Sequence, residues 1–169
     1  MKATKEKNAT NCEVLIAKSC GTLIALPKTY LSAVKDLEET ATLENLKKPL
    51  VGVAQNSGKA ILLADPKFIF GGKRKKSHIP KYLVFLESDD RHISLQVDEI
   101  LGLKTISIKP EHENQSQKNN TAFYSIKFGS QQINVIKIDT LLESLMTKEK
   151  NVYKNIAVNF AKTEEEMEE

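Results

Sequence analysis

The sequence predicts a mainly β protein in which two small β-barrels lie side by side, accompanied by short helices. About nine short apolar runs are separated by turn residues, a spacing that is typical of all-β folds. A polar segment rich in Gly and Lys, GGKRKKSHIP at 71–80, divides the chain into two similar halves. Both halves close with an apolar strand, an Asp and a turn of helix, in AILLADPKFIF and INVIKIDTLLESL. We therefore expect two lobes with their boundary near 71–80.

Composition is that of a globular protein with one compact unit. A chain of 169 residues buries roughly 70% of its unfolded surface, and 40% of these residues are hydrophobic. Leu, Ile and Val must fill the core, because Trp is absent and aromatic residues make up only 6%. A net charge of +3 is too small to indicate nucleic-acid binding from the total alone. The apolar runs are too short for a signal peptide or a membrane span, so we expect a cytoplasmic protein.

Turn residues between apolar runs predict two hairpins in the first half. EVLIAK at 13–18 and TLIALP at 22–27 flank a Ser-Cys-Gly turn, and PLVGVAQ and KAILLAD flank the QNSG turn at 55–58. The second half repeats this pattern in KYLVFLE, RHISLQV, LKTISIK, AFYSIKF and INVIKID. The sheets are therefore expected to consist of short antiparallel strands.

The period of the apolar residues predicts one helix and one half-buried strand. A helix is expected over 30–37, where apolar residues recur at helical spacing, namely Leu31, Val34 and Leu37. RHISLQV alternates, which places three apolar residues on one face of a strand, namely Ile93, Leu95 and Val97.

Two Asp residues and one Thr stand where helices are expected to begin. Asp65 precedes Pro66, which suits an N-cap followed by Pro at the first helical position. Thr140 and Glu143 match a capping box at the start of a short helix. Asp65 and Asp139 are therefore interpreted as helix caps rather than catalysts.

The domain organisation follows from these elements. Residues 1–11 are expected to be disordered, and 12–148 to form a single domain of two lobes. HENQSQKNNT at 112–121 is a polar loop. Residues 149–169 are expected to form a C-terminal amphipathic helix and a solvated acidic tail, TEEEMEE.

Asp98 and Glu99, in LQVDEILGL, are the pair of acids that most invites a catalytic interpretation. Adjacent residues of a strand point to opposite faces, so the two carboxylates converge only if the strand breaks there. A structural turn or surface contact is favoured, and a metal or catalytic pair is the alternative.

Histidines and cysteines do not form a recognisable site in the sequence. His78, His92 and His112 are scattered, and neither a CxxC nor a zinc spacing is present. Cys12 and Cys20 are expected to be reduced, half-buried thiols, with a disulfide across the hairpin as the alternative. We expect no catalytic residues, no metal and no cofactor, and therefore a binding or scaffold module rather than an enzyme.

The run Lys73, Arg74, Lys75 and Lys76 is the one concentrated basic patch in the sequence. It is interpreted first as a solvated loop, and otherwise as a docking site for an acidic protein surface. A nucleic-acid-binding β-barrel module is the alternative function, although stacking aromatics do not interleave with these residues.

Three stretches together resemble the CheW-like adaptor family of bacterial chemosensory systems. GVAQNSGKAILLADP matches in register a family segment that contains an Arg-Gly pair and a closing Asp, from Gly52 through Gly58 to Asp65. YLVFLESDDRHISLQVDEILGLKTI resembles a family strand–turn–strand, with Val97 and Asp98 on its motif. INVIKIDTLLESL resembles the last strand and closing helix, so the resemblance spans roughly 12–145.

The resemblance implies a fold and a function. The fold is two five-stranded, SH3-like β-barrel lobes related by pseudo-twofold symmetry. The function is a non-catalytic adaptor that couples the regulatory domain of a CheA-type histidine kinase to methyl-accepting chemoreceptors, pilus-control proteins or another adaptor. Contact with membrane arrays would occur only through partners. The partner-binding residues it implies are Leu31, Val34, Asn56, Ser57, Gly58 and Asp98.

The sequence departs from the family pattern at three positions. Ser57 replaces the Arg of the Arg-Gly pair, Leu62 replaces a Pro, and Ala33 stands where the family has Glu. Losing a bidentate Arg is not a conservative change. The resemblance is thus to a divergent member, as in systems that control type IV pili and twitching.

Overall fold

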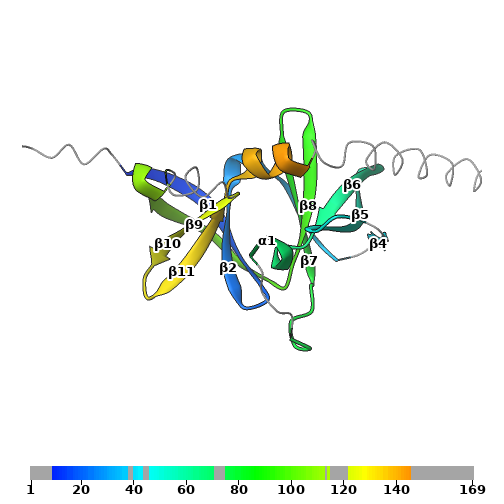
Figure 1. Cartoon of the computed structure of the whole chain (residues 1–169), viewed down its shortest axis with the longest axis horizontal. Coiled ribbons are helices and arrows are strands. Elements are labelled where there is room, and N and C mark those ends of the chain that lie inside the picture. Colours follow the sequence, from blue (N-terminus) through cyan, green and yellow to red (C-terminus); the bar gives the residue numbers. More distant parts are fainter. Residues whose placement is uncertain are drawn as a thin grey trace, which may run out of the picture.

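The computed structural model describes residues 9–37, 40–43, 46–70, 75–112, 114 and 122–145, which form two β-sheets (Figure 1). The strands of sheet A are β1 (Thr10–Ser19), β2 (Thr22–Pro27), β9 (Glu99–Ile108), β10 (Phe123–Phe128) and β11 (Gln131–Ile136). The strands of sheet B are β3 (Leu31–Asp36), β4 (Thr40–Thr42), β5 (Leu50–Asn56), β6 (Lys59–Ala64), β7 (Tyr82–Ser88) and β8 (Arg91–Val97). Short helical segments are η1 (Lys28–Tyr30), α1 (Lys67–Phe70) and those over 110–112 and 138–145. The prediction of a mainly β protein with two lobes is confirmed.

The strand order is β10-β11-β2-β1-β9 in sheet A and β3-β7-β8-β6-β5-β4 in sheet B. The expected five strands per lobe are found in sheet A, whereas sheet B has a sixth, the short edge strand β4. Gly52 allows β4 to lie against β5, because a Cβ at this position would be 2.1 Å from the Ala41 carbonyl oxygen.

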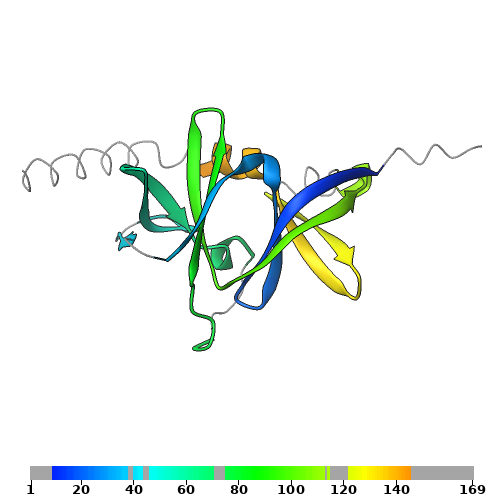
Figure 2. The ribbon, with the colours of Figure 1, turned by 180° about the vertical axis from the view of Figure 1, so that it is seen from behind.

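Each sheet combines strands from both halves of the chain, as the two opposite views in Figures 1 and 2 show. The hairpin β1–β2 joins β9, β10 and β11 in sheet A, while the hairpin β7–β8 joins β3 to β6 in sheet B. Parallel pairs, β11–β2 and β6–β8, lie where strands of the two halves meet. If β4 is left out, the two sheets have the same strand order. The equivalent strands are β1 and β7, β2 and β8, β9 and β3, β10 and β5, and β11 and β6. The lobes are therefore related by a pseudo-twofold exchange of strands.

The chain does not pass from one sheet to the other at 71–80, where the sequence predicts the lobe boundary. This segment leads from α1 to β7, and the strands on both sides of it, β6 and β7, belong to sheet B. The crossings lie instead at η1, between β2 and β3, and at Asp98, between β8 and β9. The segment at 71–80 thus separates the two repeats rather than the two lobes.

The strands are continuously apolar because both of their faces are buried. In β1, Val14 and Ile16 pack inside sheet A, while Leu15 and Ala17 face a second core between the sheets. In β7, Leu83 and Phe85 pack inside sheet B, while Val84 and Leu86 face the shared core. The helix over 138–145 adds apolar residues to this shared core, namely Ile138, Leu141, Leu142 and Leu145. In the described part of the chain, three apolar clusters therefore hold the sheets together, and the largest lies between the sheets.

The helix predicted over 30–37 is wrong, because Leu31–Asp36 form strand β3 and Tyr30 ends η1. Residues Leu31 to Asp36 pair with β7, and a bulge lies between Leu31 and Ala33. Leu31 is half-buried and Val34 is 44% exposed, so the two do not share a buried helical face. Long-range pairing with the buried strand β7 overrides the local helical spacing.

Several predictions about loops and termini can also be compared with the structure. Thr10 and Asn11 belong to β1, so strand pairing begins inside the segment expected to be disordered. The helix over 138–145 begins before Thr140, so the predicted capping box is wrong. The predictions for 1–8, 149–169 and most of 112–121 fall outside the described residues.

Both hairpins predicted in the first half are confirmed. Cys20 and Gly21, and likewise Ser57 and Gly58, have positive φ angles between 51° and 79°, as two-residue hairpin turns require. Within the described residues, no helix is long and apolar enough to cross a membrane.

The shared core generates a stability prediction. Leu95→Ala should lower the free energy of unfolding by about 2–5 kcal/mol, because Leu95 is fully buried between the sheets. Leu101→Ala is the matched control, since Leu101 is 45% exposed and its truncation should change stability by less than about 0.5 kcal/mol. Urea denaturation measures both changes, and equal losses in the two variants would contradict a core between the sheets.

Candidate functional site

One end of sheet B gathers most of the predicted partner-binding residues. Val34 lies on β3, and Asn56 lies at the end of β5. Lys35 Nζ donates to Asn56 Oδ1 at 2.7 Å, which joins the edge strand β3 to β5, four positions away in the strand order, and shows that the sheet curls. We call Val34, Lys35, Asn56, Ser57 and Gly58 the hairpin-tip surface, in which Val34 points away from Lys35, to the other face of the edge strand β3.

The tip of the β5–β6 hairpin is exposed, and its turn holds Ser57 in position. Ser57 and Gly58 have φ angles of 52° and 77°, and both are exposed. Gly58 has open space where a Cβ would lie, so the surface of another protein could approach its backbone. Leu31, at the start of β3, is different because it is half-buried against the shared core.

Asp98 lies apart from the hairpin-tip surface, at the crossing between β8 and β9. Its Oδ2 accepts the backbone N–H of Cys20 at 2.8 Å, and its own N–H donates to the Lys18 carbonyl at 2.9 Å. Glu99, the adjacent acid, is exposed. Asp98 therefore holds the β1–β2 turn against the crossing between the sheets, and its role in partner binding stays a prediction.

Two exposed leucines on β9 were not predicted as site residues. The pairing of β1 with β9 has a bulge at Ile16 and Ala17, and Gly102 opposite it has a φ angle of 113°. Leu101 is the extra residue of this bulge, and Leu101 and Leu103 are 45% and 47% exposed. Bulges redirect side chains and are not visible in an apolar run, so the sequence offers no signal for this patch.

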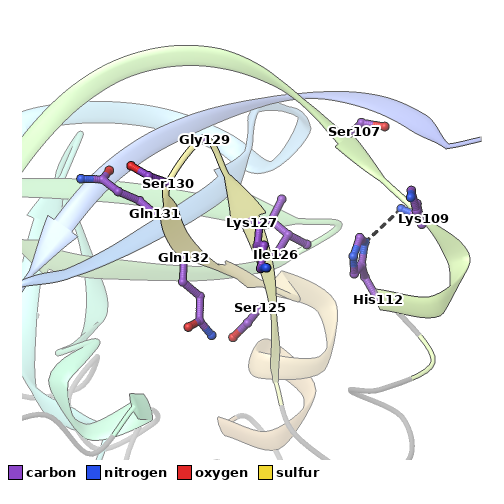
Figure 3. Close-up of a pocket in the computed structure, with 10 residues that line it drawn as sticks. All are labelled: Ser107, Lys109, His112, Ser125, Ile126, Lys127, Gly129, Ser130, Gln131 and Gln132. Carbon is purple, nitrogen blue, oxygen red and sulfur yellow. Dashed lines mark hydrogen bonds between the residues drawn. The ribbon is translucent and has the colours of Figure 1, made fainter.

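An open cavity of about 950 Å³ lies between the end of β9 and the β10–β11 hairpin (Figure 3). Figure 3 shows Lys109 and His112 facing the hairpin that carries Lys127 and Gln132. His112 Nδ1 accepts the Lys109 backbone N–H at 3.2 Å, and its ring is parallel to that of Tyr124. The described residues that line the cavity include neither Asp nor Glu. The lining offers imidazole, ammonium, hydroxyl and amide groups, which can donate or accept hydrogen bonds to a polar ligand.

Asp139 joins the two lobes through its carboxylate. Tyr30 and Ser88 donate to it at 2.7 and 2.6 Å, and Arg91 Nη2 forms an ion pair with it at 3.1 Å. Tyr30 belongs to η1, Ser88 and Arg91 flank the β7–β8 turn, and Asp139 lies inside the helix over 138–145. The predicted role of Asp139 as a helix cap is therefore wrong, because its oxygens bind side chains from other segments.

This network shifts the pKa of two groups. The hydrogen bond to Asp139, followed by partial burial, raises the pKa of Tyr30 from 10.0 to about 12. The hydrogen bonds from Ser88 and then Tyr30 lower the pKa of Asp139 below 3.8. The Asp139 side chain is 56% exposed, so solvent screens these interactions and their effect on stability is small. The network orients segments rather than activating a nucleophile.

Asp65 does cap a helix, as predicted. Its Oδ1 accepts the backbone N–H of Lys67 at 3.0 Å, and its Oδ2 accepts Gln96 Nε2 at 2.8 Å. The second contact ties the beginning of α1 to β8.

Of the histidines and cysteines, Cys20 and His78 lie close together, and the others lie elsewhere in the molecule. His92 lies 3.6 Å from Glu87 on the β7–β8 hairpin, whereas His78 lies next to the β1–β2 turn. Cys12 and Cys20 are half-buried and form no disulfide, as predicted. Cys20, His78 and Asp98 lie close together, a grouping that the sequence does not reveal because three separate segments supply it.

The basic patch is only partly described. Lys75 and Lys76 are exposed, and residues 73 and 74 lie outside the described part of the chain. Its role stays a prediction.

Comparison with known proteins agrees with this architecture. The family model described as CheW-like domain matches residues 13–146. The crystal structure of the scaffolding protein TtCheW from Thermoanaerobacter tengcongensis is similar, with a TM-score of 0.57 and 20% sequence identity. The similarity covers 76% of this chain and 90% of that one. No curated protein matches the sequence.

The Asp139 network generates a prediction about pH. Below about pH 10 the bond from Tyr30 stabilises the fold, and this contribution is lost as the pH rises from 10 through about 12. The contribution of Asp139 is present above pH 3.8 and is lost at lower pH, where the carboxylate is protonated.

Asp139→Asn should lower the pKa of Tyr30 toward 10, because the negative charge that holds its proton is gone. Ultraviolet titration of phenolate, with Tyr30→Phe as the baseline, measures this shift, and an unchanged titration would contradict the network.

Proposed function

The chain belongs to the CheW-like domain family, and from this premise we propose that it is a non-catalytic adaptor in bacterial chemosensory signal transduction. It couples the regulatory domain of a CheA-type histidine kinase to a methyl-accepting chemoreceptor, a pilus-control protein or another adaptor. It works in the cytoplasm and reaches membrane arrays only through these partners. It requires no cofactor for this role.

The hairpin-tip surface is the observation that carries the proposal. Four of the residues implied by the family resemblance, Val34, Asn56, Ser57 and Gly58, belong to this surface, with Lys35 bonded to Asn56. Val34 is exposed on an edge strand, and edge strands are common docking sites for other proteins. The exposed apolar side chain of Val34, together with the polar groups of Lys35 and Asn56, suits contact with a protein partner.

The two lobes offer separate surfaces, as coupling of two partners requires. The hairpin-tip surface belongs to sheet B, whereas Leu101 and Leu103 are exposed on β9, an edge strand of sheet A. Asp98 lies between them in the chain and fixes the crossing from β8 to β9. We assign the hairpin-tip surface to the kinase and the β9 edge to the second partner.

The departures from the family pattern support a specialised adaptor. Ser57 occupies the exposed turn position where the family has Arg, and Ala33 is half-buried where the family has Glu. A partner that relies on these charges would lose its ion pairs here. These features support a role in a system of the kind that controls type IV pili and twitching, with another adaptor as a partner.

The proposal predicts a binding defect at the hairpin-tip surface. Val34→Asp should weaken binding of the kinase regulatory domain at least tenfold, because it places a charge in the contact (about 1.4 kcal/mol per tenfold). Isothermal titration of the full chain with the regulatory domain from the same genome measures the affinity.

Phe128→Asp is the matched control, because Phe128 is 36% exposed at the β10–β11 hairpin of the other sheet. It should leave kinase binding unchanged. Absence of binding by the unaltered chain at micromolar concentrations would contradict the adaptor role, and equal loss in both variants would contradict the assigned surface.

A further inference from the structure

Three potential metal ligands from separate segments meet at one end of the molecule. Cys20 comes from the β1–β2 turn, His78 from the segment before β7, and Asp98 from the crossing between β8 and β9. One ligand atom of each, a sulfur, an imidazole nitrogen and a carboxylate oxygen, lies within 4.8 Å of the other two. All three residues are half-buried. Around a tetrahedral ion, ligand atoms are about 3–4 Å apart, so small side-chain movements would close this triangle.

Backbone hydrogen bonds hold the three segments in place before any ion binds. Asp98 N–H donates to the Lys18 carbonyl, and the Cys20 N–H donates to the Asp98 carboxylate. Lys81 N–H donates to the Val97 carbonyl at 2.8 Å, which fixes the segment that carries His78. A prearranged ligand set loses little conformational entropy on binding a metal.

The arrangement of the three groups does not suit nucleophilic catalysis. In a Cys–His–Asp relay the thiol and the carboxylate bind opposite nitrogens of the imidazole, which separates them by the width of the ring. Here the Cys20 sulfur and an Asp98 oxygen are themselves within 4.8 Å of each other, so the groups form a triangle. A triangle of three donors is the arrangement that surrounds an ion.

The donor types indicate which ion fits. A thiolate, an imidazole and a carboxylate together suit Zn²⁺, whereas Mg²⁺ and Ca²⁺ prefer oxygen ligands alone. Thiolate and carboxylate neutralise the two positive charges, which matters because Lys18 and Lys81 line the adjacent open cavity of about 410 Å³. This cavity gives an ion access from solvent and leaves the fourth coordination position open.

The imidazole must change its tautomer to bind through the nitrogen that faces the turn. The Cε1–Nε2 edge of His78 lies nearest to Gly21 in the β1–β2 turn, at 3.7 and 4.0 Å from the position of a Cβ built there. Nδ1 accepts the Lys75 N–H over a long 3.4 Å. When Nε2 binds a metal, Nδ1 carries the ring proton and this weak bond is given up.

We propose that Cys20, His78 and Asp98 form a site for a divalent transition-metal ion, with Zn²⁺ as the ion of best fit. Binding releases the thiol proton of Cys20 and links the β1–β2 turn, the segment between the repeats and a crossing between the sheets. The ion thereby ties sheet A to sheet B at this end of the molecule. The inference is independent of the proposed adaptor function.

Titration of the chelator-treated full chain with Zn²⁺, followed by calorimetry, tests the site. We expect one ion per chain and a rise in thermal stability. Co²⁺ in place of Zn²⁺ should give a sulfur-to-cobalt charge-transfer band in the near ultraviolet. Cys20→Ser should remove this band, and His78→Gln should weaken Zn²⁺ affinity by at least about tenfold, because each loses one ligand.

Cys12→Ser is the matched control, since Cys12 is the second half-buried thiol and packs against the core of sheet A. It should keep both the band and the affinity. Circular dichroism shows whether each variant is folded, and His78 lies outside the strands, so its variant tests the site even if Cys20→Ser does not fold. Absence of Zn²⁺ binding by the unaltered chain, or binding that His78→Gln leaves unchanged, would overturn the proposal.

Discussion

The apolar contact between the two sheets is the interaction on which the rest of the structure depends. Strands such as β1 and β7 bury one face inside their own lobe and the other against the opposite lobe. Burial of apolar surface is the dominant favourable contribution to folding, and here most of the fully buried large side chains serve the contact between lobes. Because each sheet also takes strands from both halves of the chain, neither half can complete a lobe without the other half.

The hydrogen bonds of Asp139 and Asp98 depend on this contact between the sheets, because they lie where the chain enters or leaves the shared core. Asp139 draws η1 and the β7–β8 turn toward the helix over 138–145, which runs between the lobes at the top of Figure 1. Asp98 fixes the second crossing by accepting the Cys20 amide. Residues that could bind partners, such as Val34 and Leu103, lie on edge strands away from this core. Their exposure is compatible with stability because the core does not need them.

Local features of the fold could be predicted from the sequence, and long-range ones could not. The apolar runs and the turn at Ser57 and Gly58 are encoded within a few residues, so their strands and hairpins were predictable. The local spacing of apolar residues predicts a helix where strand β3 lies, since only the pairing of β3 with the distant strand β7 decides between the two periods. The exchange of strands likewise depends on pairs such as Thr10 with Ile108, which no local pattern indicates.

The same distinction applies to the candidate sites. The family resemblance identifies the turn at Ser57 by its motif, whereas Leu101 is the extra residue of a bulge that has no sequence signature, and Leu103 lies two residues further along the same edge strand. Asp139 looked like a cap because it precedes an apolar helix, but its partners come from segments far away in the chain. Cys20, His78 and Asp98 have no ligand spacing because the fold, rather than one motif, brings them together.

The same exchange of strands could be made by two separate chains, each half as long as this one. Two copies of one such repeat could complete the same pair of sheets, each copy giving its hairpin to one sheet and its remaining strands to the other. The fold thus contains, within one polypeptide, the arrangement of a domain-swapped homodimer. Joining the copies through the segment at 71–80 makes assembly independent of protein concentration and lets the two surfaces diverge separately.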